Sequence, residues 1–118
     1  MDQGLMVVGA VLVGIAALFG LILWGLEVAR KDFPQVLGFV HPTLAMAGLI
    51  MLVARFFIRG GAPWFNVGLA LLVVAAAGGL VLVARGFRRR AMIRTVTAMH
   101  GLLGLTGLGF VIYQLTHR

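Results

Sequence analysis

Four long apolar stretches constrain this chain more than any other feature of its sequence. They cover residues 5–26, 36–58, 65–84 and 91–115, and each is long enough to cross the hydrocarbon core of a bilayer, which takes about 20 residues. A soluble chain of 118 residues has too little interior to hide so much apolar surface. The pattern therefore predicts an all-α integral membrane protein.

The connections between these stretches are short and cover residues 27–35, 59–64 and 85–90. Helices joined in this way run antiparallel, so we expect a four-helix transmembrane bundle with up-down-up-down topology. At this length, residues 1–118 form a single domain. We interpret the first stretch as a retained helix and not as a signal peptide, because it lacks a basic leading segment and a clear cleavage motif.

The net charge of +7 comes from basic residues that lie almost entirely in the connections. This placement indicates membrane topology and not nucleic-acid binding, because cytoplasmic loops are enriched in Lys and Arg. Connections 27–35 and 85–90 hold most of these residues, so we expect both in the cytoplasm and both termini outside. The Arg-, Ala-, Gly- and Val-rich composition favours a bacterial inner membrane. Trp24, Trp64 and Tyr113 lie near span ends, where aromatic side chains commonly sit at the membrane interface.

Shifting the sequence by 59 residues aligns it with itself without a gap. The matches least expected by chance are Gly9 with Gly68, Gly20 with Gly79, Gly48 with Gly107 and His41 with His100. The sequence thus predicts two tandem repeats, residues 1–59 and 60–118, of two helices each. Because each repeat contains two spans, both copies insert the same way round. We expect parallel repeats related by an approximate two-fold axis along the membrane normal.

The repeat places His41 and His100 at the same depth, several residues inside the cytoplasmic ends of the second and fourth stretches. An ionisable residue within a membrane is costly and indicates a functional site. Two facing imidazoles fit one haem b, whose iron they ligate axially from both sides. A lone membrane histidine often serves only as an interhelical hydrogen-bonding group, which is the alternative for each residue alone. Zinc or copper fits less well, because no third or fourth ligand is visible.

Further residues are expected to line the haem site. Gly48 and Gly107 follow the histidines by seven residues, about two helical turns, and would leave room for the flat macrocycle. Gly20 and Gly79, on the other two helices, would admit its edge. His117, near the C-terminus, is expected to be a solvated tail residue. The anionic propionates would meet basic residues at the cytoplasmic edge, namely Arg30, Lys31, Arg89, Arg90 and Arg94.

Two short motifs resemble those of the cytochrome b-561 family. The segment 39–49, which contains His41-Pro42, resembles the His-Pro helix of that family, and His100-Gly101-Leu102-Leu103 resembles its His-Gly-Leu-Leu motif. Members are transmembrane electron carriers that hold haem b between histidine pairs, so the resemblance implies axial ligation by the two histidines. The family carries two haems on four liganding histidines, whereas this chain has one such pair. In the family the two motifs lie on successive helices, whereas here a helix intervenes.

These features favour a single-haem membrane cytochrome b that exchanges electrons with a quinone or quinol pool. We expect it to act within a larger redox complex or as a homodimer, by outer-sphere transfer, since both axial positions are filled. No nucleophile–base constellation or carboxylate pair is present, so no catalytic residue is predicted and a stand-alone enzyme is not expected. The second hypothesis is a cofactor-free structural or assembly subunit in contact with membrane lipid. A small transporter is favoured less, because no span holds a carboxylate in its interior.

Overall fold

The computed structural model describes residues 3–32, 35–87 and 94–117. These residues form four helices, α1 (Gly4–Val28), α2 (Gln35–Arg59), α3 (Pro63–Phe87) and α4 (Arg94–Thr116). All four are long and apolar enough, by length and composition, to cross a membrane. The prediction of an all-α chain with four long apolar helices is confirmed. Of the fourth predicted stretch, residues 91–93 lie outside the described residues.

Local sequence explains where α2 ends and α3 begins. Gly60 follows the last residue of α2 with a φ of 78°, a left-handed conformation that glycine adopts without strain. Its N–H donates to the carbonyl oxygen of Phe56 at 2.9 Å. Pro63 is the first residue of α3, where the helix needs no N–H group and the fixed φ of proline suits the helix. Glycine and proline thus produce the turn between α2 and α3.

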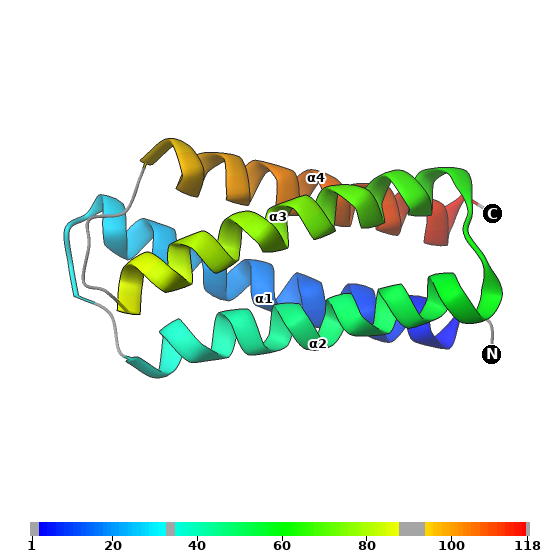
Figure 1. Ribbon diagram of the computed structural model, residues 1–118, viewed down its shortest axis with the longest axis horizontal. Helices are drawn as coiled ribbons and strands as arrows, with labels where there is room; N and C mark the ends of the chain where they lie inside the picture. Colours follow the sequence, from blue (N-terminus) through cyan, green and yellow to red (C-terminus); the bar gives the residue numbers. More distant parts are fainter. Residues whose placement is uncertain (1–2, 33–34, 88–93, 118) are drawn as a thin grey trace.

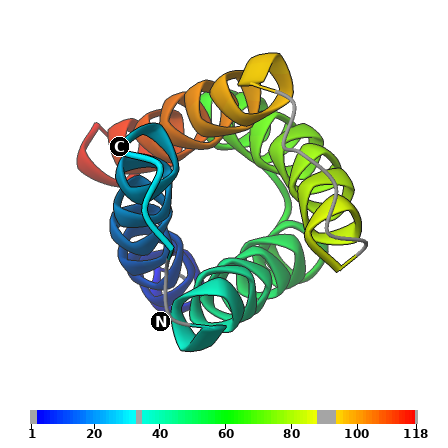
Figure 2. The same cartoon turned by 90° about the vertical axis from the view of Figure 1, so that its left-hand side faces the viewer.

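The four helices run alternately up and down in a bundle that measures 42 × 24 × 21 Å (Figure 1). The two ends of the chain lie at the same end of the bundle. Viewed along its axis, the bundle is a square with the helices in chain order around it, so that α2 and α4 lie on a diagonal (Figure 2). Packing is most extensive within the pairs α1–α2 and α3–α4. The bundle therefore consists of two closely packed helix pairs that meet more loosely.

Glycines hold the two helices of each pair close together. A Cβ atom on Gly48 would lie 2.8 Å from the carbonyl oxygen of Gly9 and 2.9 Å from the backbone nitrogen of Val13. In the other pair, a Cβ atom on Gly107 would lie 2.8 Å from the carbonyl oxygen of Gly68. These distances leave no room for a side chain, so the backbones meet directly, as at small-residue contacts between membrane helices.

Side-chain burial divides the bundle into two halves. Every buried residue among those described lies within 6–16, 48–75 or 107–111, which is the half that contains the chain ends. Of residues 17–47 and 76–106, none of those whose burial is described is buried. The largest fully buried side chains are those of Phe65, Met6, Leu52 and Val111. One half of the bundle is thus a packed apolar core, and the other half is more open.

Many large apolar side chains point outward from the bundle. Ile50 is 62% exposed, Leu102 66% and Phe57 79%. Among the described residues, no polar or charged side chain is buried. Apolar side chains over so much of the exterior fit a surrounding of lipid, because a soluble protein rarely exposes large apolar patches.

Replacing Gly107 by alanine should destabilise the bundle, because the new methyl group would collide with the backbone of α3. We expect a loss of about 1–3 kcal/mol, the usual range for an overpacked interior, measured as a lower thermal unfolding midpoint in detergent by circular dichroism. Gly109→Ala is the control on the same helix, because a Cβ atom there has no neighbour within 4 Å. Equal midpoints for the two variants would contradict the close contact between α3 and α4.

Candidate functional site

Two histidines lie opposite each other across the diagonal of the bundle. His41 belongs to α2 and His100 to α4, each six residues beyond the first residue of its helix (41 − 35 and 100 − 94). The two ring centroids are 6.0 Å apart, and the ring planes cross at 88°. Both side chains are half-buried. The structure thus brings together the two residues that the sequence pairs.

Each ring is anchored by one hydrogen bond to the neighbouring helix of its own pair. His41 Nδ1 donates to the carbonyl oxygen of Ala16, and His100 Nδ1 donates to that of Ala75, both at 2.7 Å. Because a carbonyl oxygen only accepts, the proton of each neutral ring lies on Nδ1. Nε2 then carries a lone pair and has no hydrogen-bond partner within the described part of the chain. Metal-binding histidines have the same arrangement, with one ring nitrogen held by a carbonyl and the other available.

Two of the predicted glycines lie against the imidazole rings. A Cβ atom on Gly20 in α1 would be 2.8 Å from His41 Cε1, and one on Gly79 in α3 would be 2.9 Å from His100 Cε1. Both distances are too short for a real side chain beside the ring. In the structure these glycines give room to the histidine rings, and their expected role in admitting the edge of a haem stays a prediction.

The other two predicted glycines serve the packing of the helix pairs. Gly48 meets the backbone of α1, and Gly107 meets the backbone of α3. Contact with the neighbouring helix is sufficient to explain why no side chain is tolerated at either position. Their expected role in making room for a macrocycle stays a prediction.

Basic residues lie at the end of the bundle nearer to the histidines. Arg30 occupies the turn after α1 with a φ of 56°, and Arg94 is the first residue of α4. Both residues are exposed, as is Lys31. Arg89 and Arg90, which were expected to join them, lie outside the described residues. The described basic residues give this end of the bundle a positive charge that suits an anionic group.

The separation of the two rings fits a metal ion held between them. Zinc–imidazole bonds, for example, are about 2.0–2.1 Å long, so two ligating nitrogens lie roughly 4 Å apart and the ring centres about 6 Å apart. The observed centroid distance is 6.0 Å. Within the described ranges, no group of three or more His, Cys, Asp or Glu side chains is placed to hold a metal. His41 and His100 are thus the two side chains that could hold a group between them here.

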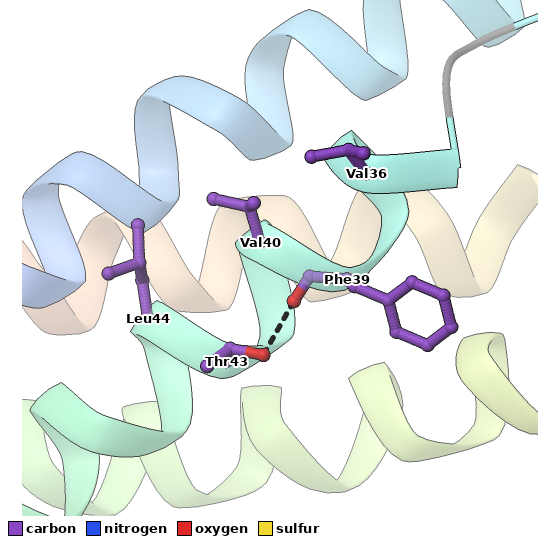
Figure 3. A pocket seen from close by; sticks show the side chains of 5 residues that line it. All are labelled: Val36, Phe39, Val40, Thr43 and Leu44. Carbon is purple, nitrogen blue, oxygen red and sulfur yellow. Dashed lines mark hydrogen bonds between the residues drawn. The ribbon is translucent and has the colours of Figure 1, made fainter.

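An open groove of about 360 Å³ lies along α2 in the same half of the bundle. It is lined by Val36, Phe39, Val40, Thr43 and Leu44 (Figure 3). The hydroxyl of Thr43 donates to the carbonyl oxygen of Phe39 at 2.7 Å. Because the lining offers no other polar side chain to orient a ligand, we do not count the groove as part of the histidine site.

Aromatic side chains gather at the opposite end of the bundle. Trp64 stacks on Phe110 with centroids 5.7 Å apart and meets Tyr113 edge-on at 5.5 Å. His117 stacks on Tyr113 at 4.0 Å and is exposed. The third histidine is therefore remote from the His41–His100 pair. The position of Trp64 and Tyr113 near helix ends fits the interfacial role predicted for them.

A scan against protein-family models found no match, and searches of curated proteins and of solved structures found none either. The resemblance of the two histidine motifs to the cytochrome b-561 family accordingly remains a prediction. A function for this chain has to be inferred from the geometry of the histidine pair itself.

Sequence reasoning missed the carbonyl groups that anchor the rings. Ala16 and Ala75 contribute backbone atoms, and a backbone acceptor leaves no signal in the residue type. The one available hint was that these two alanines are themselves 59 residues apart (75 − 16), like the histidines that they hold.

We expect both paired histidines to carry their proton on Nδ1, because each Nδ1 faces a carbonyl oxygen. Nitrogen-15 NMR of histidine-labelled, metal-free protein in detergent distinguishes the two tautomers, at a pH where the rings are neutral. His41→Ala and His100→Ala assign the signals. A protonated Nε2 on either ring would contradict the bonds to Ala16 and Ala75.

Proposed function

We propose that this chain is a membrane-embedded b-type cytochrome that holds one haem between His41 and His100 and transfers electrons. The observation that carries the proposal is the geometry of this pair. The two rings are half-buried and 6.0 Å apart, each is bonded through Nδ1, and each has an Nε2 without a hydrogen-bond partner among the described residues. Ionisable side chains within membranes are rare and mostly functional.

In this proposal His41 and His100 would hold the haem iron through their Nε2 atoms. The carbonyl oxygens of Ala16 and Ala75 would orient the rings, as hydrogen-bond acceptors behind a metal ligand do. A haem held by these two histidines would supply one-electron transfer.

The basic end of the bundle suits the two anionic propionates of such a haem. Arg30 and Arg94 are exposed at this end, and a guanidinium group binds a carboxylate through charge-assisted hydrogen bonds. Arg89 belongs to the same proposed group by its position in the sequence.

Unequal packing of the bundle supports a cofactor in the histidine half. Wherever burial is described, buried side chains lie in the half with the chain ends and none lies within 17–47 or 76–106. Helix bundles commonly hold cofactors between side chains of facing helices. A half without a packed apolar core is the part of this bundle where a large flat group can lie.

We infer that the chain consists of two tandem repeats, residues 1–59 and 60–118. The contacts of one helix pair recur in the other at positions 59 residues along the chain. They include the histidine–carbonyl bond, the glycine beside the imidazole ring and the contact between glycine backbones. Recurrence of three separate contacts supports a repeat more strongly than matches between apolar residues do.

For location we propose the bacterial inner membrane, with connections 27–35 and 85–90 in the cytoplasm and both termini outside. The positions of most lysines and arginines support this orientation. The haem would then lie nearer to the cytoplasmic surface. Proposed electron partners are a quinone or quinol pool and other subunits of a redox complex, or a second copy of the chain.

Two other functions explain the histidine pair less well. A cofactor-free assembly subunit would use the glycine contacts but has no need for two rings held 6.0 Å apart. A proton- or cation-coupled transporter usually needs a carboxylate within the membrane. The one carboxylate in a described helix is that of Glu27, which lies in the last turn of α1.

An optical spectrum of the detergent-purified protein, oxidised and then dithionite-reduced, tests the proposed haem. We expect sharp α and Soret bands on reduction in the wild type, and their loss in His41→Ala and in His100→Ala. His117→Ala is the matched control and should keep the full spectrum, since His117 lies at the other end of the bundle. A colourless wild type from haem-replete cells would contradict the proposal and favour an assembly subunit.

Cysteine labelling tests the proposed orientation, because the chain has no cysteine of its own. We introduce Asp32→Cys and His117→Cys separately, since both positions are exposed at opposite ends of the bundle. A membrane-impermeant thiol reagent added to intact spheroplasts should label the second variant, and the first only after lysis. The reverse pattern would mean that the connections with most of the arginines face outward.

A further inference from the structure

Two contacts fix the rotation of each imidazole ring in the site. The His41 ring is held at Nδ1 by the Ala16 carbonyl, and its Cε1 edge lies against Gly20, where a Cβ atom would be only 2.8 Å away. Ala16 and Gly20 are four residues apart, so both contacts come from the same face of α1. A histidine side chain has only two torsion angles. A bond at one ring atom and a close contact at the next therefore leave the ring a single orientation.

The second ring is held by the same two contacts in the other helix pair. His100 Nδ1 donates to the Ala75 carbonyl at 2.7 Å, and its Cε1 edge lies against Gly79, where a Cβ atom would be 2.9 Å away. The planes of the two rings cross at 88°. Because each ring is fixed by contacts within its own helix pair, the crossing angle is set by the arrangement of the helices.

We propose that Gly20 and Gly79 are positioning residues that hold the two axial imidazoles with their planes at right angles. This inference rests on the proposed haem. An axial imidazole donates π electron density to the iron orbital that is perpendicular to its own plane. Two such iron d orbitals exist, at right angles to each other. Parallel rings both donate to the same one and separate the two in energy. Crossed rings donate to one each and keep the two close in energy. The arrangement of axial ligands is one means by which a protein tunes a haem.

Electron paramagnetic resonance of the oxidised protein at liquid-helium temperature measures this orbital separation. Crossed rings give a highly anisotropic low-spin signal with one prominent feature at low field, and parallel rings give a rhombic signal with three resolved features. We expect the low-field signal for the wild type. Haem optical bands together with a rhombic signal would overturn this inference and leave the proposed function standing. A protein without haem would overturn both.

Alanine substitution tests the role of the glycines directly. In Gly79→Ala the methyl group would displace the His100 ring at Cε1, so we expect the low-field signal to be lost or replaced by a rhombic one while the α band persists. Gly78→Ala is the neighbouring control, because a Cβ atom there would lie 3.8 Å from His100 Cβ, an ordinary contact. This variant should keep the wild-type signal.

Gly20→Ala repeats the test in the other helix pair, so that the result does not depend on the folding of one variant. Its control is Gly25→Ala on the same helix, since a Cβ atom there has no neighbour within 4 Å. Wild-type resonance signals in haem-loaded Gly20→Ala and Gly79→Ala would overturn the positioning role. Loss of the low-field signal in these two variants, with its retention in the two controls, would support it.

Discussion

Direct contact between glycine backbones within each helix pair is the interaction on which the rest of the structure depends. In lipid no hydrophobic force draws apolar helices together, so close packing and hydrogen bonds must do so. Where Gly48 meets Gly9, the two helices approach closely. His41 lies seven residues before Gly48, about two turns along the same face, so the contact that joins the helices also turns this ring toward α1. The ring therefore forms its hydrogen bond to the Ala16 carbonyl, which a wider separation of the two helices would not allow.

Each helix pair thereby contains one half of the site. That half consists of a histidine, the carbonyl group that orients its ring and the glycine that leaves room for the ring. The two halves meet across the diagonal, where packing between the pairs is looser than packing within them. Orientation and separation of the rings are thus governed by different parts of the structure. The contacts within a pair fix how each ring points, and the association of the two pairs fixes the distance of 6.0 Å between the rings.

The four helices were predictable from sequence because the length and apolar composition of each stretch identify it as a candidate span, whatever its neighbours are. The turn between α2 and α3 was predictable for an equally local reason, namely Gly60 and Pro63. The histidines were paired through the internal repeat. The rotation of each helix was not predictable, because it depends on which small residues meet on two different helices. For that reason the contacts of Gly48 and Gly107 with the neighbouring helices were not foreseen, and their expected place beside a haem stays a prediction.

The division of the bundle into a packed half and an open half explains how the site keeps its geometry. Met6, Leu52, Phe65 and Val111, one from each helix, fill the interior near the chain ends and pack the four helices together there. The histidine half has no such core among the residues whose burial is described, and its helices are continuous with those of the packed half. Each of the two rings is held in its orientation by its own bond to the carbonyl oxygen of Ala16 or Ala75. Such preorganisation favours a ligand that enters between them, because the protein has little left to rearrange when it binds.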